Sequence, residues 1–180
     1  MASQFHLADL FEGVAAAVPD RLAVITDSRS LTYAELNDRA DRVASALAAQ
    51  GVVRGDTVGL YMTNRVEHLE AFIAVVKLGA VPFNVNYRYR ADELRYLFTN
   101  AQAAAVIHDA AFSAIISDTR HDLPSLKVAA AVDAFDADHD HLAPGPGQLA
   151  QLGQSGDMRE VLLLAAVEQI EHRVGAGRLT

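Results

Sequence analysis

The sequence predicts an α/β fold in which a parallel sheet is flanked by helices and preceded by one helix and a small β-hairpin. Between residues 57 and 132, short apolar runs alternate with segments of helical periodicity. The apolar runs are nearly continuous, which is typical of parallel strands that are covered on both faces. With 180 residues and a hydrophobic share of 51%, the chain can bury a core without disulfides or metal.

The first fifty residues are expected to form a helix, a hairpin and a second helix. Residues 7–18 have an amphipathic pattern that ends before Pro19. Residues 22–26 and 30–32 are short β-like runs separated by a turn. Thr32 and Glu35 have the spacing of a helix capping box. The apolar stripes of the two helices are Leu7, Leu10, Phe11 and Val14, then Leu36, Ala40, Val43 and Leu47.

The remaining elements alternate regularly. Strands are expected at 57–61, 80–85, 103–107 and 126–132, and helices at 66–78, 92–100 and 110–119. In the helix at 66–78, Leu69, Phe72, Ile73 and Val76 are expected to face inward and Glu70 outward. In the helix at 92–100, the residues expected to face inward are Leu94, Leu97 and Phe98.

Composition excludes several classes of protein. The formal net charge is −8 and cysteine is absent, which disfavours a general nucleic-acid binder and excludes disulfides and cysteine-ligated metal. No stretch approaches a membrane span, and the first residues show no signal peptide. We therefore expect a soluble cytoplasmic protein, with no nucleic-acid partner.

Five segments in order resemble one family. They are Leu-Thr-Tyr-Ala-Glu-Leu at 31–36, Gly-Asp-Thr-Val-Gly-Leu at 55–60, Asn-Arg-Val-Glu at 64–67, the run from Gly79 to Tyr89, and Asp-Glu-Leu-Arg-Tyr-Leu at 92–97. Their order and spacing resemble the N-terminal region of AMP-forming acyl-CoA synthetases, the adenylate-forming ligases. The Asn-Tyr-Arg-Tyr and Glu-Leu-Arg-Tyr pieces are most similar to the bacterial fatty-acyl-CoA synthetase branch. The resemblance covers about residues 5–132.

The resemblance implies a two-step reaction for a complete family member. Such an enzyme uses ATP and Mg²⁺ to convert a carboxylic acid, here a fatty or similarly apolar one, to an acyl-adenylate and pyrophosphate. The thiol of coenzyme A then attacks the adenylate and gives the thioester. Because the carboxylate and the triphosphate are both anions, such a site must neutralise charge with hydrogen-bond donors and a metal.

The chain departs from the family after residue 157. Where the family has a loop rich in Ser, Thr and Gly that ends in Pro-Lys-Gly, this chain has Met-Arg-Glu-Val-Leu-Leu-Leu-Ala at 158–165. The family's Tyr-x-x-Thr-Glu motif, ribose-binding Asp segment and C-terminal catalytic lysine are also not found. We therefore expect residues 1–132 to be a partial ligase subdomain, 133–157 an acidic and then Pro/Gly-rich linker, and 158–180 an atypical tail with a short helix.

This pattern predicts an N-terminal ligase fragment that is inactive alone. We expect no cofactor for this chain, and we assign no catalytic, cofactor-binding or metal-binding residue in it. A frameshift, a truncated gene and an artificially shortened chain all fit, and self-association through an uncovered surface is expected. The alternatives are a non-catalytic binding or assembly module that retains the ligase scaffold and, as a third reading, a stand-alone flavodoxin-like regulatory domain.

Most other polar clusters are predicted to be structural. The Arg54–Asp56 tripeptide is expected to form a turn, the scattered histidines to be surface or loop residues, and the stripe in the tail to be a docked helix. The loop after the strand at 80–85 is the best place for a functional contact, but the favoured interpretation is that Asn86 and Arg88 cap helix ends and pin the loop by hydrogen bonds. The residues concerned are Asn84, Asn86, Tyr87, Arg88 and Tyr89 in the loop; His6, His68, His108, His121 and His172; and Leu163, Val167, Ile170 and Val174 in the tail.

Two further clusters contain residue types that could bind a ligand, but the sequence favours a structural interpretation of both. Carboxylates and imidazoles at 133–141 could bind a cation, but their spacing fits a solvated acidic loop better. The glycines near 145–156 lack a preceding strand, and prolines remove amide donors. The residues concerned are Asp133, Asp136, Asp138, His139, Asp140 and His141, and Gly145, Gly147, Gly153 and Gly156.

Overall fold

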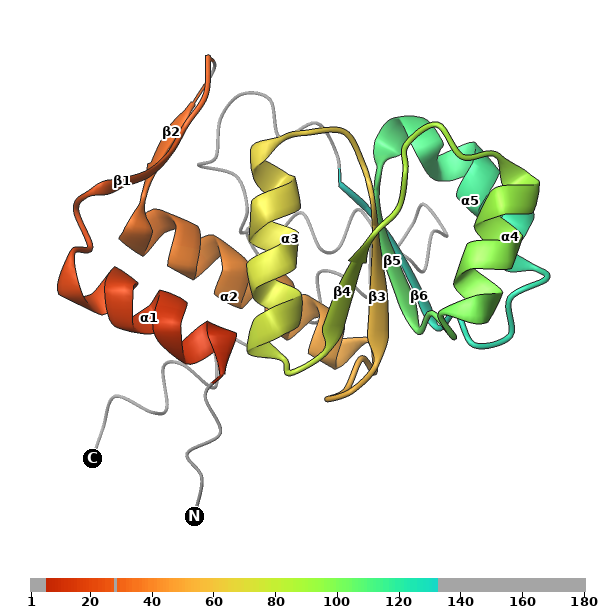
Figure 1. Ribbon diagram of the computed structural model, residues 1–180, viewed down its shortest axis with the longest axis horizontal. Coiled ribbons are helices and arrows are strands. Elements are labelled where there is room, and N and C mark those ends of the chain that lie inside the picture. The colour runs from red at the N-terminus through yellow and green to blue at the C-terminus, as the bar shows by residue number, and fades with distance from the viewer. Residues whose placement is uncertain (1–5, 28, 133–180) are drawn as a thin grey trace, which may run out of the picture. The chain divides into compact units, whose positions relative to one another are not determined.

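The computed structural model describes residues 6–27 and 29–132 (Figure 1). The predicted linker at 133–157 and the tail at 158–180, with the candidate clusters in them, lie outside these residues. None of the helices in the described part is long and apolar enough to cross a membrane.

The described residues follow the predicted order of elements. The N-terminal part contains helix α1, a β1–β2 hairpin and helix α2, and the rest alternates between strands and helices. The bounds are α1 Leu7–Ala17, β1 Leu22–Ile25, β2 Ser30–Thr32, α2 Tyr33–Ala49, β3 Thr57–Tyr61, α3 Val66–Lys77, β4 Val81–Asn84, α4 Ala91–Asn100, β5 Ala105–Asp109, a 3₁₀ turn Ala110–Phe112, α5 Ser113–Arg120 and β6 Val128–Val132.

Local hydrogen bonds explain the start of α2 and the hairpin before it. The Thr32 hydroxyl accepts from the Glu35 amide at 3.2 Å, and the Thr32 amide donates to the Glu35 carboxylate at 2.7 Å. This confirms the predicted capping box, which satisfies donors that a helix start otherwise leaves unpaired. In the hairpin, the amide of Thr26 donates to the carbonyl of Arg29 at 2.8 Å, and β1 and β2 pair antiparallel.

Four strands form a parallel sheet in the order β4–β3–β5–β6. Figure 1 shows α2 and α3 on one side of this sheet and α4 and α5 on the other. Each side has its own apolar core: one is built around Ile73 and Ala74 of α3 with Leu36 of α2, and the other around Phe98 of α4 and Ile116 of α5. The predicted α/β fold is therefore confirmed.

The two central strands are more buried than the edge strands β4 and β6. β3 is buried from Val58 onward and β5 is buried throughout, as the apolar runs predict. β4 lies at an edge, and its first residue Val81 is 51% exposed. The nearly continuous apolar runs predicted burial on both faces for these strands. This prediction is correct for β3 and β5 and wrong for β4.

Of the apolar stripe predicted for α1, only Phe11 packs against the core. Leu7, Leu10 and Val14 are 53%, 46% and 41% exposed, whereas the buried residues of the helix are Ala8 and Ala15. Small side chains let α1 lie close to its neighbours, so the helix turns its larger apolar side chains outward.

The predicted outer face of α3 is also wrong. Glu70 is 3% exposed and pairs with the buried Arg39 of α2, with Nε–Oε1 at 2.5 Å and Nη2–Oε2 at 3.2 Å. Ile73 is buried as predicted, but Leu69 is 39% exposed. A charged pair between two packed helices follows no hydrophobic period, so the sequence pattern could not reveal it.

Candidate functional site

The most polar cluster of the sheet lies where β3 and β5 end. The chain runs from β3 to β4 on one side and returns across β3 to β5 on the other. The gap between the carboxyl ends of β3 and β5 is therefore the topological switch point, the usual ligand position in an open α/β sheet. The sequence prediction chose the loop after β4, which is one strand away at the edge.

Asp109 is the centre of this cluster. One carboxylate oxygen, Oδ2, accepts from the amide of Thr63 at 2.9 Å and from its hydroxyl at 3.1 Å. The other, Oδ1, accepts from the Arg65 guanidinium. Thr63 and Arg65 lie in the loop between β3 and α3, so the last residue of β5 holds that loop in place.

The network continues from Arg65 to Glu67. Nε of Arg65 donates to Oε2 of Glu67 at 2.7 Å, and Glu67 also pairs with Arg29 of the hairpin at 3.6 Å. Burial alone would raise the pKa of Glu67, but hydrogen bonds from Arg65 and the backbone, with the charges of Arg65 and Arg29, hold it below its usual range. The network therefore ties the hairpin to the switch point.

The same forces act on Asp109. Burial raises the pKa of its carboxyl, but the hydrogen bonds from Thr63 and Arg65 together outweigh burial, so the pKa lies below its usual value. Asp109 is thus ionised at neutral pH with three donors engaged. This arrangement suits a positioning role better than proton transfer or metal binding.

His108 is adjacent to the cluster and is only 3% exposed, so its prediction as a surface or loop residue is wrong. Its Nδ1 lies 2.9 Å from the Asp109 carbonyl oxygen, and burial lowers its pKa. In the register of the sheet it lies opposite Tyr61, whose ring stacks on Phe112 with centroids 4.4 Å apart.

In the loop after β4, hydrogen bonds hold the chain in place, as predicted for residues with a structural role. The side-chain oxygen of Asn86 accepts from the Arg88 amide at 3.0 Å, which closes a tight turn. The Tyr61 hydroxyl donates to the carbonyl of Tyr89 at 2.8 Å. The Arg88 guanidinium lies 5.3 Å from the centroid of the exposed Tyr87 ring. Asn84, Asn86 and Arg88 are all exposed at this edge.

The predicted turn at 54–56 is confirmed. Gly55 has φ +87°, which favours glycine, and the Asp56 carboxylate accepts from the Val53 amide at 3.0 Å. His6 also has a structural place, because its Nδ1 accepts from the Ala8 amide at 3.3 Å at the start of α1.

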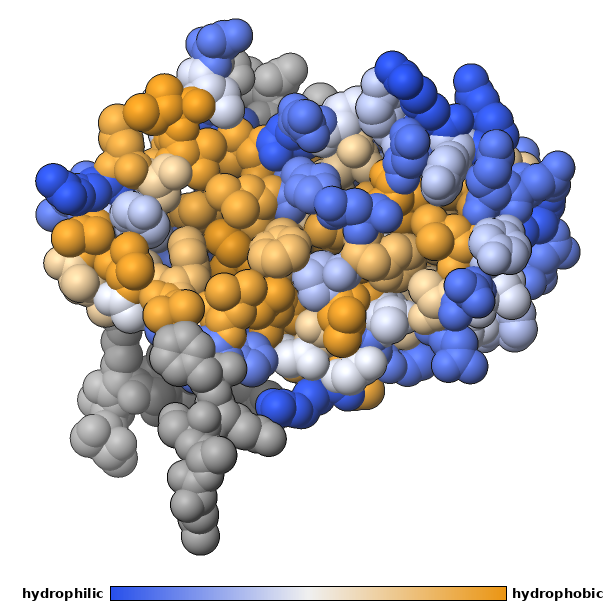
Figure 2. All heavy atoms as spheres, in the orientation of Figure 1, coloured by the Kyte–Doolittle hydropathy of each residue, from blue (hydrophilic) through white to orange (hydrophobic). Residues whose placement is uncertain are grey.

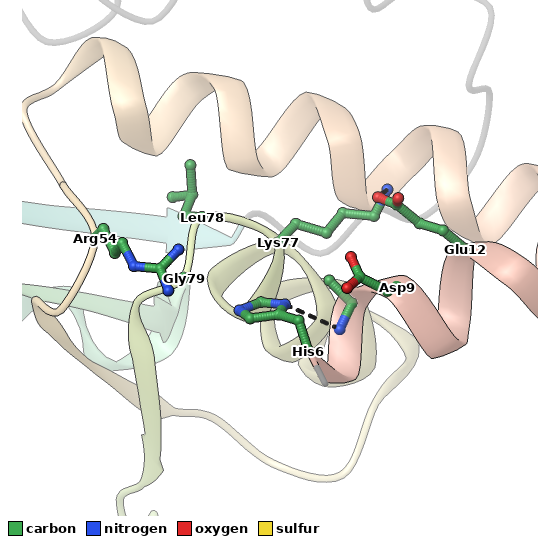
Figure 3. Close-up of a pocket in the computed structure, with 8 residues that line it drawn as sticks. His6, Asp9, Glu12, Arg54, Lys77, Leu78 and Gly79 are labelled. Carbon is green, nitrogen blue, oxygen red and sulfur yellow. Dashed lines mark hydrogen bonds and ion pairs between the residues drawn. The ribbon is translucent and has the colours of Figure 1, made fainter. Parts of the chain in front are cut away.

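A cavity of about 840 Å³ lies elsewhere, between the N-terminus of α1 and the C-terminus of α3. Figure 3 shows His6, Arg54 and Lys77 around it together with Asp9 and Glu12. Nζ of Lys77 is already paired with Glu12 at 2.8 Å, so cations and anions compensate. The cavity also lies near the amino ends of the strands, away from the switch point.

Within 6–27 and 29–132, no group of three or more His, Asp or Glu side chains could hold a metal ion. Asp109, the acid at the switch point, is fully engaged by Thr63 and Arg65. What the arrangement can do is fix the loops that border one edge of a ligand site.

Together, the strand order and the polar switch point define an open, doubly wound α/β domain. A family model described as "AMP-binding enzyme" matches residues 11–160. The chain therefore belongs to the AMP-binding enzyme family, which confirms the resemblance read from its motifs.

Individual relatives agree with this assignment. The chain is 43% identical over 140 residues to the Medium/long-chain-fatty-acid--CoA/3-oxocholest-4-en-26-oate--CoA ligase of Mycobacterium tuberculosis, and the match covers 77% of this chain and 26% of that protein. A solved Mycobacterium tuberculosis fatty acyl CoA synthetase aligns with TM-score 0.66 and 28% identity over 71% of this chain and 26% of that one.

A second solved structure carries an adenylate. The anthranilate CoA ligase AuaEII in complex with anthranoyl-AMP aligns with TM-score 0.67 and 26% identity, over 71% of this chain and 25% of that chain. The chain thus spans about a quarter of the length of each of these three relatives.

The sequence analysis did not predict that three residues at the switch point form a site. They are Thr63, Arg65 and Asp109. One signal was available, because Asp109 directly follows an apolar run. The run was predicted to end at residue 107, so His108 and Asp109 were placed in a connecting segment. The neighbourhood of β3 and β5 depends on strand order, which alternation of elements does not specify.

Proposed function

We propose that this chain is the N-terminal part of an AMP-forming acyl-CoA synthetase and has no activity by itself. The parent reaction is ATP-dependent conversion of a carboxylic acid to an acyl-adenylate, followed by transfer of the acyl group to coenzyme A. The observation that supports this most strongly is the 43% identity over 140 residues to a fatty-acid–CoA ligase, joined to the fold shared with solved ligases.

The physical role of these residues in the parent enzyme is to build one wall of the site. The clamp formed by Asp109, Thr63 and Arg65 fixes the loop after β3, while Asn86 and Tyr61 fix the loop after β4. Both loops leave the same edge of the sheet because the strands are parallel. Rigid loops at this edge lower the entropy lost when a substrate is held for reaction.

The acid that the parent enzyme activates is proposed to be fatty or similarly apolar. The Mycobacterium tuberculosis relative is named for medium- and long-chain fatty acids and for a steroid-derived acid, and both have large apolar bodies. ATP, Mg²⁺ and coenzyme A would be needed only by the complete enzyme.

Absence of activity in the 180 residues alone follows from the motifs that the sequence lacks. No Ser/Thr/Gly-rich loop ending in Pro-Lys-Gly is present, and the one lysine after Gly79 is Lys127. Nζ of Lys127 pairs with Asp56 at 3.3 Å beside the start of β3, away from the carboxyl ends of the strands.

The test is pyrophosphate release by the purified chain. ATP, Mg²⁺ and a panel of fatty acids are added, and a heat-denatured sample is the control. We expect no release above that control. Release that depends on both ATP and a fatty acid would refute the proposal that these residues are inactive.

The division of the chain and its setting are part of the same proposal. Residues 1–132 form the partial ligase subdomain, 133–157 a linker and 158–180 an atypical tail. We propose a cytoplasmic setting for the protein and self-association through surface that a complete ligase would cover. Reading the genomic DNA around the codon for Asp157 in all frames separates the two explanations: a Pro-Lys-Gly loop in another frame supports a ligase gene, whereas its absence supports a non-catalytic module.

A further inference from the structure

Four side chains of alternating charge form a line from the hairpin to the end of β5. Arg29 lies between β1 and β2, and its Nη1 is 3.6 Å from Oε1 of Glu67 in the first turn of α3. Glu67 also pairs with Arg65, and Arg65 with Asp109. These four side chains are only 7% to 23% exposed. We call them the charge line, and they join the hairpin, α3 and β5 at the switch point.

The inner members of the charge line use separate atoms for their two neighbours. Glu67 faces Arg29 with Oε1 and accepts from Nε of Arg65 with Oε2, at 2.7 Å. Arg65 donates through Nη1 to Oδ1 of Asp109. Oδ2 of Asp109 then accepts from the amide of Thr63 at 2.9 Å. Because guanidinium and carboxylate groups are planar and bind in fixed directions, a displacement of one group changes its contact with the next.

Stability alone does not explain this many buried charges in one place. Removing ions from water is costly, and the attraction between the partners often does no more than offset that cost. Apolar side chains of similar size would fill the same space without the penalty. They would not, however, fix the direction of a neighbouring group as a guanidinium between two carboxylates does. The charge line is therefore better suited to orienting the groups at the switch point than to stabilising the fold.

The buried pair of Arg39 and Glu70 differs from the charge line in what it joins. Two nitrogens of Arg39 contact both oxygens of Glu70, and the pair connects α2 to α3. The charge line ends instead on the amide and hydroxyl of Thr63. Thr63 belongs to the loop at the carboxyl end of β3, which borders the usual ligand position of an open α/β sheet. The charge line therefore acts on that loop.

We propose that Arg29 and Glu67 are positioning residues for acyl-CoA formation, because they orient Arg65 and thereby hold the loop at 63–65 in place. The inference rests on the proposed function and extends its site to the hairpin, since Arg29 lies 34 positions before Thr63 in the sequence. The two residues act through Arg65 and not by touching a substrate. A loop that is already held loses less entropy when a substrate binds, so its release should weaken substrate binding.

The first test measures order in the 180-residue chain without substrate. NMR relaxation gives order parameters for the Nε–H group of Arg65 and the amide of Thr63, where about 0.85 is rigid and less than about 0.6 is flexible. We expect both groups to be rigid in the unaltered chain and to become flexible in Glu67→Gln and Arg29→Gln. Arg29→Lys keeps the charge and should keep both groups rigid. If Thr63 stays rigid in both Gln variants, the proposal is overturned.

Asp122→Asn is the matched control for Glu67→Gln. Nε of Arg95 donates to Oδ2 of Asp122 at 2.7 Å, the same distance as in the contact that Glu67→Gln alters. Arg95 lies on α4, on the other side of the sheet from α3 (Figure 1), and Figure 2 shows that the surface over α4 is mostly polar. This variant should leave Thr63 rigid. An equal loss of order at Thr63 in the control would be a general effect and would overturn the proposal.

The second test measures the reaction. Residues 6–132 of this chain replace their counterparts in the Mycobacterium tuberculosis ligase, and acyl-CoA formation is followed while ATP, a long-chain fatty acid and coenzyme A are varied in turn. Glu67→Gln and Arg29→Gln should raise KM for at least one of these substrates about fivefold or more, whereas Arg29→Lys and Asp122→Asn should not. A purely structural defect would reduce the number of folded molecules, which lowers the apparent kcat and leaves KM unchanged.

The outcomes of the second test separate this inference from the proposed function. A chimera that folds but forms no acyl-CoA contradicts the proposed function, and with it the inference that rests on it. A chimera that forms acyl-CoA with the same KM values in every variant contradicts only the positioning role of Arg29 and Glu67. Raised KM in the two Gln variants alone, together with loss of order at Thr63, supports the positioning role.

Discussion

The pair formed by Arg39 and Glu70 gives the sharpest prediction about stability. Both side chains are almost completely buried, at 8% and 4% exposure, and two hydrogen bonds join them between α2 and α3. Glu70→Gln keeps the size of the side chain and removes its charge. The guanidinium of Arg39 then stays buried without the negative charge of Glu70 beside it.

The expected cost is large because the charge left behind is desolvated. Removing one member of a buried ion pair typically costs about 3–5 kcal/mol of unfolding free energy. Asp38→Asn is a matched control: it removes one carboxylate charge from an exposed position of α2, and it should cost less than about 0.5 kcal/mol. Replacing both partners with Met and Leu should recover most of the loss, because the burial penalty of both charges disappears.

The measurement is urea unfolding at pH 7, followed by circular dichroism. It compares wild type, Glu70→Gln, Asp38→Asn, the single replacements Arg39→Met and Glu70→Leu, and the double replacement that combines these two. A cost for Glu70→Gln equal to that of Asp38→Asn would refute the buried pair. Strictly additive losses in the double replacement would refute the coupling between the two side chains.

Two further predictions concern the sheet. Gly59→Ala should cost about 1–3 kcal/mol in urea unfolding through overpacking, because its Cβ would lie 3.1 Å from atoms of Phe83 and Phe98; an unchanged midpoint would contradict this packing. Asp109→Asn should cost about 1–3 kcal/mol at pH 7 by weakening charge-assisted hydrogen bonds. Because the folded pKa of Asp109 lies below its unfolded value of about 3.9, its stabilisation is present above that value and is lost as the pH falls through the folded pKa. The difference between wild type and Asp109→Asn should therefore shrink below about pH 4, and a constant difference would contradict the clamp.

Much of the fold could be predicted because its signals are local. The capping box of Thr32 and Glu35 depends on residues three apart, and the strand–helix alternation from β3 to β6 depends on period alone. Both were predicted from the sequence and both are present.

What could not be predicted depends on contacts between distant residues. Arg39 and Glu70 lie 31 positions apart, and each looks like an ordinary surface charge in its own helix. Asp109 and Thr63 lie 46 positions apart and meet only because β3 and β5 are neighbours. The outward stripe of α1 was missed for a related reason, since a period shows which residues share a face but not which face is covered.

The family motifs contributed what local patterns could not. They identified the ligase scaffold from short segments between residues 31 and 97, whereas no single polar cluster specified a reaction. The switch point gives that scaffold a rigid edge.

The most direct test of the central claim is a chimera. The 140 residues of the Mycobacterium tuberculosis ligase that match this chain are replaced by their counterparts here, and acyl-CoA formation from ATP, a long-chain fatty acid and coenzyme A is measured beside the unaltered ligase. If these residues are a ligase subdomain, the chimera folds and forms acyl-CoA. A chimera that unfolds cooperatively but forms no acyl-CoA would contradict that claim, and would indicate a scaffold retained for another purpose.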